Sequence, residues 1–470
     1  MIDEKMYIVL PEKRLYHVDE RPYDPAKPRI KDLIWDHYDW LKKMDEEGKA
    51  RKCVLDNCQK VLLCNTLYLG YDGFECPNCG NWNLVYRHCH SRFCTSCGVK
   101  TQKVLAAKAE EMCLDVKHRH IVFTIPEEYR LWFRKDRSSL NLLFIAARNT
   151  ICKVTNENLY RKMKRKQKKS GKYRNDKDNT YLFRNYKDRN EFGMIATIHT
   201  FGRALNWNPH IHALVAELIY DSKKDAYREF HHFDYENLRK TWQYEINRLM
   251  KEHFGKPFNK VLRNNFSEYG DGLYVYAKSD KFDPEQDKKT NHSANIKGCI
   301  NYMMRYASRP AMAESRLLSY DRKFHSVQWY YDDHKTEERI EVNESSLELL
   351  KKMIIHIPDD GFRTTRYYGF YNNKEQELLD HLHQMLGKVR NISRTKNDRR
   401  RSLRAKLNRL KYRTHCADTF NRDILKCHCG STMVYFDSYN PLEGKHNDRF
   451  YRQSCIDEMR MLRIRRAGPS

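Results

Sequence analysis

The segment His210-Ile-His212 places two histidines on either side of one aliphatic residue in a predicted β-strand. Side chains alternate between the two faces of a strand, so both imidazoles are expected on one face. His199 ends the preceding predicted strand, and a turn containing Asn-Trp-Asn-Pro joins the two strands. If the hairpin is symmetric about residues 204 and 205, His199 lies across from His210 on that same face. Three converging imidazoles can hold a divalent cation.

The third ligand of such an ion is open at the level of sequence. His199 could instead orient another ligand or contact a substrate. Asn295 is the alternative, because it lies two helical turns before Tyr302 on the same face of a predicted helix. The sequence therefore favours His210 and His212 as ligands and leaves the third position between His199 and Asn295.

Tyr302 and Tyr306 lie four residues apart in that helix and share one of its faces. The ordinary pKa of tyrosine is about 10, so at neutral pH it is a weak nucleophile unless it is assisted. A cation on a phosphodiester would neutralise its charge and orient it for in-line attack by a phenol oxygen. The chain contains 31 tyrosines, so an aromatic stripe that packs the helix onto a sheet is the competing interpretation.

Cations along the same helix favour the chemical interpretation. Lys297, Arg305 and Arg309 provide the positive charge that a phosphate-binding surface requires. Together with the histidines, these residues predict an enzyme that cuts and rejoins DNA through tyrosine. The product would be a 5′-phosphotyrosine ester, which retains the free energy of the bond, so that a 3′ hydroxyl can reverse the cleavage without ATP.

The charge balance also indicates a nucleic-acid partner. The 470 residues include 88 Lys and Arg against 62 Asp and Glu, for a net charge of +26. Such an excess is typical of proteins that bind a polyanion. Two basic segments, 161–174 and 394–413, predict salt-dependent binding to nucleic acid, although the second could instead be a solvated helix face.

The chain is expected in the cytoplasm. Its first residues include acidic side chains and only a short apolar run, unlike a signal peptide. No stretch approaches the roughly 20 apolar residues that a membrane-spanning helix needs. Fifteen cysteines in a reducing compartment indicate metal binding rather than disulfides.

Two C-x2-C knuckles, Cys76-Pro-Asn-Cys79 and Cys94-Thr-Ser-Cys97, are each followed by glycine, which permits the tight turn that directs both sulfurs at one ion. We expect the two knuckles to form one four-thiolate zinc site. Cysteines and histidines nearby remain for a second zinc ion; these are Cys64, His88, Cys89 and His90. The zinc could stabilise the fold of a small domain, or it could position basic side chains such as Arg92 to contact DNA phosphates.

The order of predicted elements is β-α-β-β-α-β-α, which suits an α+β fold in which helices cover one antiparallel sheet. The strands are expected at 120–125, 192–199, 210–216 and 273–277, and the helices at 140–165, 235–253 and 293–307. Flanking helices are expected at 30–43, 52–63, 101–116 and 345–356, and a hairpin at 326–331 and 338–342.

Four motifs in this order resemble those of the two-tyrosine HUH transposases of the insertion sequence 91 family, bacterial relatives of the eukaryotic Helitrons. The resemblance extends over roughly Leu63 to Tyr371. The motifs are the zinc segment with Cys64, Cys76-x2-Cys79, Cys89 and Cys94-x2-Cys97; His199-Thr-Phe-Gly with Asn-Pro-His210-Ile-His212; Tyr302-x3-Tyr306-Ala-Ser-Arg309-Pro310; and His356-Ile-Pro with Gly361-Phe-Arg and Arg366-Tyr-Tyr-Gly369.

The resemblance implies rolling-circle transposition, in which the enzyme nicks the end of the element and transfers a single strand without a DDE-type acidic triad. It implies Mg²⁺ or Mn²⁺ at His210 and His212, with Tyr302 and Tyr306 as nucleophiles. The Cys427-His-Cys429 segment is not a clean pair of knuckles, so a C-terminal zinc site is not expected.

The resemblance also implies a domain plan, an HUH endonuclease core between a cysteine-rich domain and a basic tail. The expected segments are an N-terminal arm at 1–50, a zinc-binding DNA-binding domain at 51–112, the HUH nuclease domain at 113–320, an accessory α/β segment at 321–380, and a basic helical region at 381–470.

The implied partners are single-stranded DNA at the transposon ends and at the target. The chain has no P-loop, so no helicase motor is built in, and the need for a host helicase stays open at the level of sequence. Two other functions compete: a rolling-circle replication initiator, which uses the same catalytic parts, and a non-catalytic zinc-dependent DNA-binding protein.

Overall fold

The computed structural model describes most of the chain as two compact units. The described residues are 24–157, 190–230, 234–277, 292–333, 336–389, 396–409, 423–439 and 452–460, with a few single positions between them. Unit 1 comprises Met1–Gly98, Met312–Ile357 and Lys411–Ser470, and unit 2 comprises Val99–Ala311 and Pro358–Leu410. Each unit is therefore assembled from segments that lie far apart in sequence. The five functional segments expected from the sequence stay a prediction.

Unit 2 is built on one antiparallel sheet. Its strands follow the order β11-β4-β5-β3-β7, and β6 pairs with β5. They are β3 (His118–Phe123), β4 (Glu191–Phe201), β5 (Trp207–Asp221), β6 (Ala226–Glu229), β7 (Val275–Ala277) and β11 (Thr365–Gly369). The expected antiparallel sheet is confirmed, whereas β6 and β11 were not anticipated.

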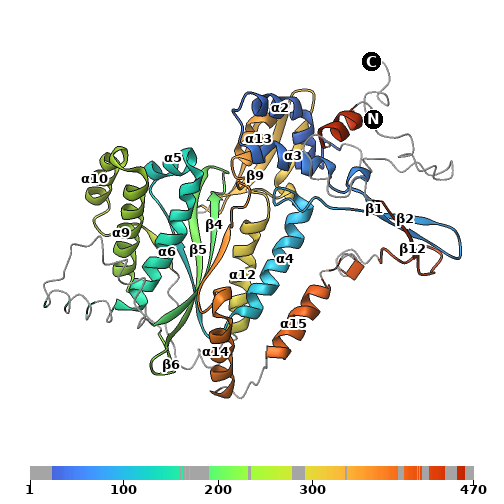
Figure 1. Cartoon of the computed structure of the whole chain (residues 1–470). Helices are drawn as coiled ribbons and strands as arrows, with labels where there is room; N and C mark the ends of the chain where they lie inside the picture. Colours follow the sequence, from blue (N-terminus) through green and yellow to red (C-terminus); the bar gives the residue numbers. More distant parts are fainter. Residues whose placement is uncertain are drawn as a thin grey trace. The chain divides into compact units, whose positions relative to one another are not determined.

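Helices cover both faces of this sheet (Figure 1). On one face lie α5 (Glu127–Lys135) and α6 (Leu140–Thr155), with α9 (Tyr235–Phe254) packed on α6. On the other face α12 (His292–Ser308) packs on β4, β5 and β3, and α4 (Thr95–Met112) lies beside α12. Unit 2 also contains α10 (Asn259–Glu268), α14 (Gln376–Val389) and α15 (Lys396–Arg409).

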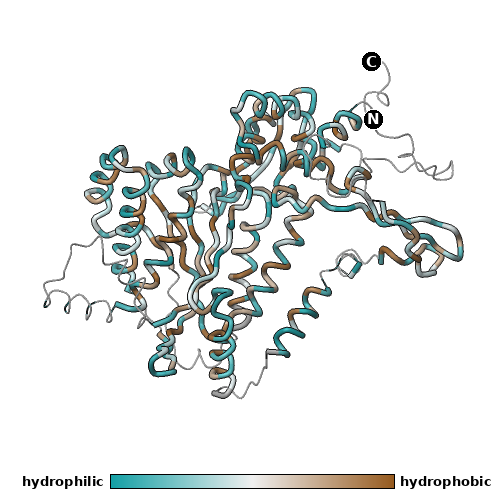
Figure 2. The backbone as a smooth tube through the Cα atoms, in the orientation of Figure 1, coloured by the Kyte–Doolittle hydropathy of each residue, from teal (hydrophilic) through white to brown (hydrophobic). Residues whose placement is uncertain are grey.

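Alternation along β5 explains this two-sided arrangement. Ile211, Ala213 and Val215 are all buried on one face of the strand. The opposite face carries His212 and then Leu214, which belongs to the hydrophobic core that contains residues of α12. Figure 2 shows hydrophobic stretches on the strands of this sheet and on α6. The face of the sheet that α12 covers therefore carries an apolar core and, toward the hairpin turn, the histidines.

The element order is richer than the sequence predicted. Between β3 and α12 the chain forms α5, α6, β4, β5, β6, α9, α10 and β7 in turn. The two extra helices and the short β6 are local additions, and β11 joins the sheet beside β4 only after α12. The helix predicted at 140–165 is regular as far as Thr155, and most of the basic segment 161–174 lies outside the described residues.

Unit 1 contains two further three-stranded antiparallel sheets and a helical layer. One sheet has the order β10-β9-β8 and the other β12-β1-β2. Their strands are β1 (Tyr71–Glu75), β2 (Trp82–Tyr86), β8 (Leu317–Asp321), β9 (Ser326–Asp332), β10 (Arg339–Ser345) and β12 (Val434–Tyr439). The helices are α1 (Ile30–Asp36), α2 (Tyr38–Glu46), α3 (Lys52–Leu63) and α13 (Ser346–Ile354).

Most local predictions in unit 1 are confirmed, including α3, α13 and the hairpin of β9 and β10. The helix expected at 30–43 is instead two helices, because His37 leaves the helical conformation between them. Within the described part of the chain, no helix is long and apolar enough to cross a membrane.

Candidate metal and nucleophile site

The hairpin of β4 and β5 brings three histidines together. His199 pairs directly with His210, as the symmetric register predicted, and two positions further along the strands Thr197 pairs with His212. The ring centroids of His199 and His212 lie 3.9 Å apart, and those of His210 and His212 lie 4.9 Å apart. One ligand nitrogen from each ring lies within 4.8 Å of the others. The three imidazoles therefore form a compact donor set on the α12 face of the sheet.

A backbone contact fixes the tautomer of His210. Its Nδ1 lies 2.6 Å from the carbonyl oxygen of Asn208. A carbonyl oxygen only accepts hydrogen bonds, so Nδ1 carries the proton and donates it. The lone pair of His210 is therefore on Nε2, where a metal ion would bind.

A fourth histidine, His120 on β3, supports the triad from the neighbouring strand. Its Nε2 lies 2.8 Å from Nδ1 of His212, and the two rings stack at 16° with centroids 5.0 Å apart. If Nδ1 of His212 donates to His120, the lone pair of His212 is on Nε2. That nitrogen is buried and has no hydrogen-bond partner among the described residues. An unsatisfied buried acceptor costs about 1–3 kcal/mol, which a bound cation would remove.

Burial keeps these imidazoles neutral. It lowers the pKa of His199 and His212 well below the usual value, and the other histidines nearby lower it further. A hydrogen bond with the Met303 backbone partly offsets this lowering of the pKa at His199. Burial likewise lowers the pKa of His210, and it lowers the pKa of His120 to about 4. Neutral imidazole is the form that binds metals, so the donor set suits a divalent cation.

Tyr302 reaches this donor set from α12. Its ring centroid lies 5.6 Å from that of His212, 5.9 Å from that of His120 and 6.4 Å from that of His199. The residue is nevertheless 42% exposed, so a large substrate can reach it. The helix and the histidine hairpin thus meet at one place in unit 2.

Two other candidate residues of α12 are described only by their place on the helix. Tyr306 lies one turn after Tyr302, and Asn295 lies two turns before it. The side chains of Tyr306 and Asn295 are outside the described part of the structure. The proposed roles of a second nucleophile and of an asparagine ligand therefore stay predictions.

The basic residues expected to bind DNA differ in exposure. Lys297 and Arg305 on α12 are exposed, whereas Arg309, just beyond the helix, is partly buried. Burial and the nearby Arg305 lower the pKa of Arg309. Arg92 belongs to unit 1, where burial lowers its pKa. DNA binding by these four residues stays a prediction.

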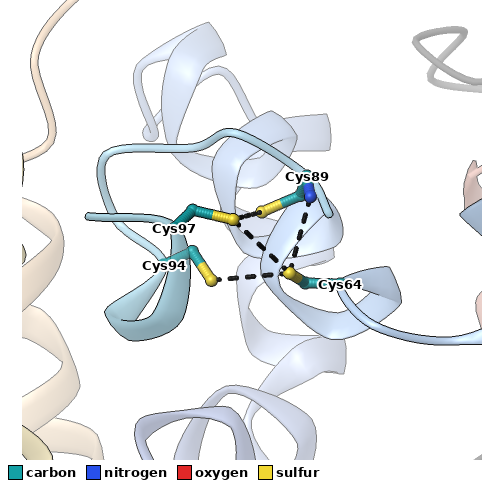
Figure 3. A group of neighbouring side chains, drawn as sticks. All are labelled: Cys64, Cys89, Cys94 and Cys97. Carbon is teal, nitrogen blue, oxygen red and sulfur yellow. Dashed lines mark hydrogen bonds between the residues drawn. The ribbon is translucent and has the colours of Figure 1, made fainter. Parts of the chain in front are cut away.

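Four cysteines of unit 1 form a first cluster, drawn in Figure 3. Cys64 follows the end of α3, and Cys94 precedes α4. The sulfur of Cys97 lies 3.7 Å from that of Cys64 and 3.7 Å from that of Cys89, and Cys94 and Cys64 are 3.6 Å apart. Sulfurs bound at about 2.3 Å to a tetrahedral zinc ion lie roughly 3.8 Å from each other. The spacing therefore fits one zinc ion.

The predicted pairing of the two knuckles is wrong. Cys76 and Cys79 do not join the Cys94 knuckle, because they lie in a second cluster with Cys427 and Cys429. Spacing along the sequence identifies knuckles but does not say which pairs share an ion, and here the partner pair is 348 residues away. His88 and His90, which the sequence offered for a second zinc ion, belong to neither cluster.

His120 is the site residue that sequence reasoning missed. A signal for it existed, because His118 and His120 alternate on a predicted strand, as His210 and His212 do. The sequence did not reveal that this strand would lie beside β5, with His120 opposite Leu214.

Comparison with known proteins identifies the class of enzyme. A family model described as "Transposase zinc-binding domain" matches residues 34–125, which contain the first cysteine cluster. A second, described as "Putative transposase", matches residues 193–378, which contain the three histidines and Tyr302. Together these two matches support a transposase of the insertion sequence 91 family.

Two curated relatives agree with this family. The transposase for insertion sequence element IS801 from Pseudomonas savastanoi pv. phaseolicola is 26% identical over 355 residues, which are 73% of this chain and 76% of the relative. A protein described as "Putative transposase y4qJ" from Sinorhizobium fredii (strain NBRC 101917 / NGR234) is 24% identical over 366 residues, 72% of this chain and 81% of the relative. No solved structure matches the chain. A transposase acts on DNA, so DNA is the substrate class.

Proposed function

We propose that this transposase nicks and rejoins single-stranded DNA through 5′-phosphotyrosine intermediates during rolling-circle transposition. The observation that carries the proposal is the placement of the Tyr302 ring against the histidines of the β4–β5 hairpin. The substrate would be the single strand at the transposon ends and at the target site, in the bacterial cytoplasm. A host helicase would supply the single strand.

In this proposal His199, His210 and His212 hold Mg²⁺ or Mn²⁺. Bound there, the ion would neutralise the scissile phosphate and stabilise the departing 3′ oxygen. Imidazole nitrogens are softer donors than the oxygens that Mg²⁺ prefers, so Mn²⁺ is the better probe for this donor set. The hydrogen bond to Asn208 and the contact with His120 orient two of the three ligand rings.

The proposed chemistry is a transesterification. The Tyr302 oxygen forms a bond with phosphorus, the bond from phosphorus to the 3′ oxygen breaks, and the phenol proton ends on that 3′ oxygen. The reverse reaction restores the phosphodiester with the same or another 3′ end. Tyr306, one turn along α12, would serve as the second nucleophile, which lets one site hold one strand while it attacks another.

Basic side chains near the proposed nucleophile would bind the DNA backbone. Exposed Lys297 and Arg305 lie on the same helix as Tyr302, and Arg309 follows it. In unit 1, we propose that Cys64, Cys89, Cys94 and Cys97 bind a structural zinc ion that fixes the start of α4 and holds Arg92 near DNA. Both relatives are named as transposases, which favours transposition over replication initiation.

A covalent-adduct assay tests the proposal. The purified chain is incubated with Mn²⁺ and a 3′-labelled single-stranded oligonucleotide spanning a transposon end, and adducts are resolved on a denaturing gel with SDS. The label lies at the 3′ end because a 5′-phosphotyrosine bond keeps the 3′ fragment on the protein. We expect an SDS-resistant adduct that requires Mn²⁺ and disappears when Tyr302→Phe and Tyr306→Phe are combined. A 5′-labelled oligonucleotide, run in parallel, should release its labelled fragment.

A matched control separates the proposed nucleophile from other exposed tyrosines. Tyr274 is 58% exposed and also belongs to unit 2, so Tyr274→Phe should form the adduct as the unmodified chain does. His212→Ala should lose the adduct even with both tyrosines present. An adduct that persists in the double tyrosine variant would show that the nucleophile is another residue.

A further inference from the structure

We propose that Cys76, Cys79, Cys427 and Cys429 bind a second structural zinc ion, which fastens the C-terminal segment of the chain to the zinc-binding domain. Neither matching family model extends to Cys427 or Cys429. The sequence alone argued against a zinc site there, because Cys427-His-Cys429 lacks the usual two-residue spacing. The inference concerns unit 1 alone and does not depend on the proposed catalytic role of unit 2.

The sulfur positions fit a tetrahedral ion. The sulfurs of Cys76 and Cys429 lie 3.5 Å apart, as do those of Cys79 and Cys427, and all four lie within 4.8 Å of one another. Four thiolates around zinc are expected roughly 3.8 Å apart. Four thiols packed at this spacing without an ion gain little, because a thiol is a weak donor and a weak acceptor.

The backbone around both cysteine pairs is shaped as a knuckle. The Gly80 nitrogen donates to the Cys76 carbonyl at 2.9 Å, and the Gly430 nitrogen donates to the Cys427 carbonyl at 2.9 Å. Both glycines have positive φ, +67° and +89°, which ordinary residues rarely adopt. A glycine turn therefore closes each pair, with the donor nitrogen four residues after Cys76 in the first pair and three residues after Cys427 in the second. The C-terminal pair is a knuckle despite its shorter spacing.

Two asparagines donate toward the sulfurs. The side-chain nitrogen of Asn78 lies 3.7 Å from the Cys429 sulfur, and that of Asn81 lies 3.8 Å from the Cys427 sulfur. Amide donors of this kind stabilise the negative charge that thiolates carry on zinc. Each of these hydrogen bonds joins the first knuckle to the second. The pairs are thus matched to each other by polar interactions as well as by sulfur spacing.

Strand pairing continues from the cysteine cluster. β12 follows the second knuckle and pairs with β1, whose last residue precedes Cys76. Aromatic pairs span this sheet, with Trp82 and Phe436 centroids 5.0 Å apart and Phe74 and Tyr435 centroids 6.0 Å apart. Three hydrophobic residues of β12, however, are exposed, namely Val434, Tyr435 and Phe436. A short strand that buries so little apolar surface would be stabilised considerably by a metal ion bound just before its first residue.

The proposed ion would close a very long loop. Cys79 and Cys427 are separated by 348 residues, and both segments of unit 2 lie between them in sequence. A cross-link stabilises mainly by restricting the unfolded chain, and the effect grows slowly with loop length. The ion would therefore link the first and last segments of unit 1, which are far apart in sequence.

Zinc stoichiometry tests the inference. The full chain is purified without chelators and its zinc content is measured by mass spectrometry of the metal. We expect two zinc ions per chain, one for each cysteine cluster, and one per chain after Cys427→Ser is combined with Cys429→Ser. Cys299→Ser is the matched control, because Cys299 is partly exposed and belongs to neither cluster, and it should keep two zinc ions.

Cobalt titration of the unmodified chain gives a second readout that does not depend on a variant folding. After zinc removal under reducing conditions, Co²⁺ is added stepwise and the thiolate-to-cobalt absorption is recorded. Saturation at two equivalents, with the same increase for each, supports two four-thiolate sites. Saturation at one equivalent, or a double serine variant that retains two zinc ions, would overturn the inference. So would disulfides between Cys76 and Cys429 in the freshly purified chain.

Hydrogen exchange locates the effect. In the double serine variant, amide exchange should accelerate in β12 and in the facing strand β1, and should remain unchanged in β9 and β10. Unchanged exchange in β12 would show that no ion clamps this strand.

Discussion

At the scale of single residues, the site depends on histidines that orient one another. His120 contacts the Nδ1 nitrogen of His212 and thereby directs the other ring nitrogen toward the proposed ion. The sequence predicted the three histidines of the hairpin because their spacing and register follow from strand geometry. It missed His120, because the neighbour of β5 is set by the order of strands in the sheet rather than by local pattern.

Replacing His120 tests this positioning role. In His120→Phe the ring shape remains but the acceptor is removed, so we expect the affinity for Mn²⁺ to fall about 10–100-fold. His120→Gln keeps a polar group and should recover part of the loss. Binding is measured by the free Mn²⁺ signal in electron paramagnetic resonance, and the thermal unfolding of each variant is checked in parallel. Equal Mn²⁺ affinity in all three proteins would refute a positioning role.

At the scale of elements, long periodic segments were predictable and edge strands were not. Helices α3, α9, α12 and α13 and the strand β4 follow from apolar periodicity and lie close to their predicted limits. Strand β5 was also predicted, but it extends three residues before and five residues beyond the predicted range 210–216. β11 was missed because it is a short edge strand, and its partner β4 lies more than 160 residues earlier in the chain. The break at His37 was missed because the apolar pattern continues through it.

A buried ion pair joins two central strands of unit 2 and can be tested by its stability. The Arg119 Nε of β3 donates to Glu217 of β5 at 2.6 Å, and both side chains are buried. Arg119→Met leaves the Glu217 carboxylate uncompensated, so we expect the free energy of unfolding to fall by about 3–5 kcal/mol. Adding Glu217→Leu should recover part of that loss.

The free energy of unfolding is measured by denaturant unfolding of the full chain. Lys224→Met is the control, because Lys224 is exposed, pairs with Asp221 at the surface, and its removal should cost little. A loss in Arg119→Met as small as in the control would mean that the buried pair does not hold the strands together.

At the scale of the whole molecule, the sequence predicted the class of protein but not the assembly of its metal sites. The net positive charge, the cysteine knuckles and the histidine hairpin could each be predicted from local sequence. Which cysteines bind the same ion could not be predicted, because Cys76 and Cys79 lie beside Cys427 and Cys429 from the far end of the chain. The discontinuous composition of both units has the same origin, since only the folded chain brings distant segments together.

The positive charge of the molecule predicts how binding depends on salt. Arg400, Arg401 and Arg404 on α15 are exposed, whereas Arg399 and Lys406 are engaged in ion pairs. Changing the three exposed arginines to glutamine should weaken single-stranded DNA binding. The slope of log K against log salt should become shallower by about 0.7 for each phosphate that the variant no longer neutralises.

Fluorescence anisotropy at several salt concentrations measures that slope. Lys251→Gln on α9 is the control, because Lys251 is exposed but lies outside the basic segments. If the triple variant and the control have the same slope as the unmodified chain, α15 is a solvated face and does not bind DNA.

The most direct measurement is to identify the residue that carries DNA. After reaction with a single-stranded oligonucleotide and Mn²⁺, the adduct is digested with protease and nuclease, and the modified peptide is sequenced by tandem mass spectrometry. We predict a 5′-linked nucleotide on Tyr302 or Tyr306, and none when His212→Ala removes a proposed metal ligand. A nucleotide found on any other residue, or on Tyr302 without a divalent ion, would contradict the shared site of the histidines and the tyrosine.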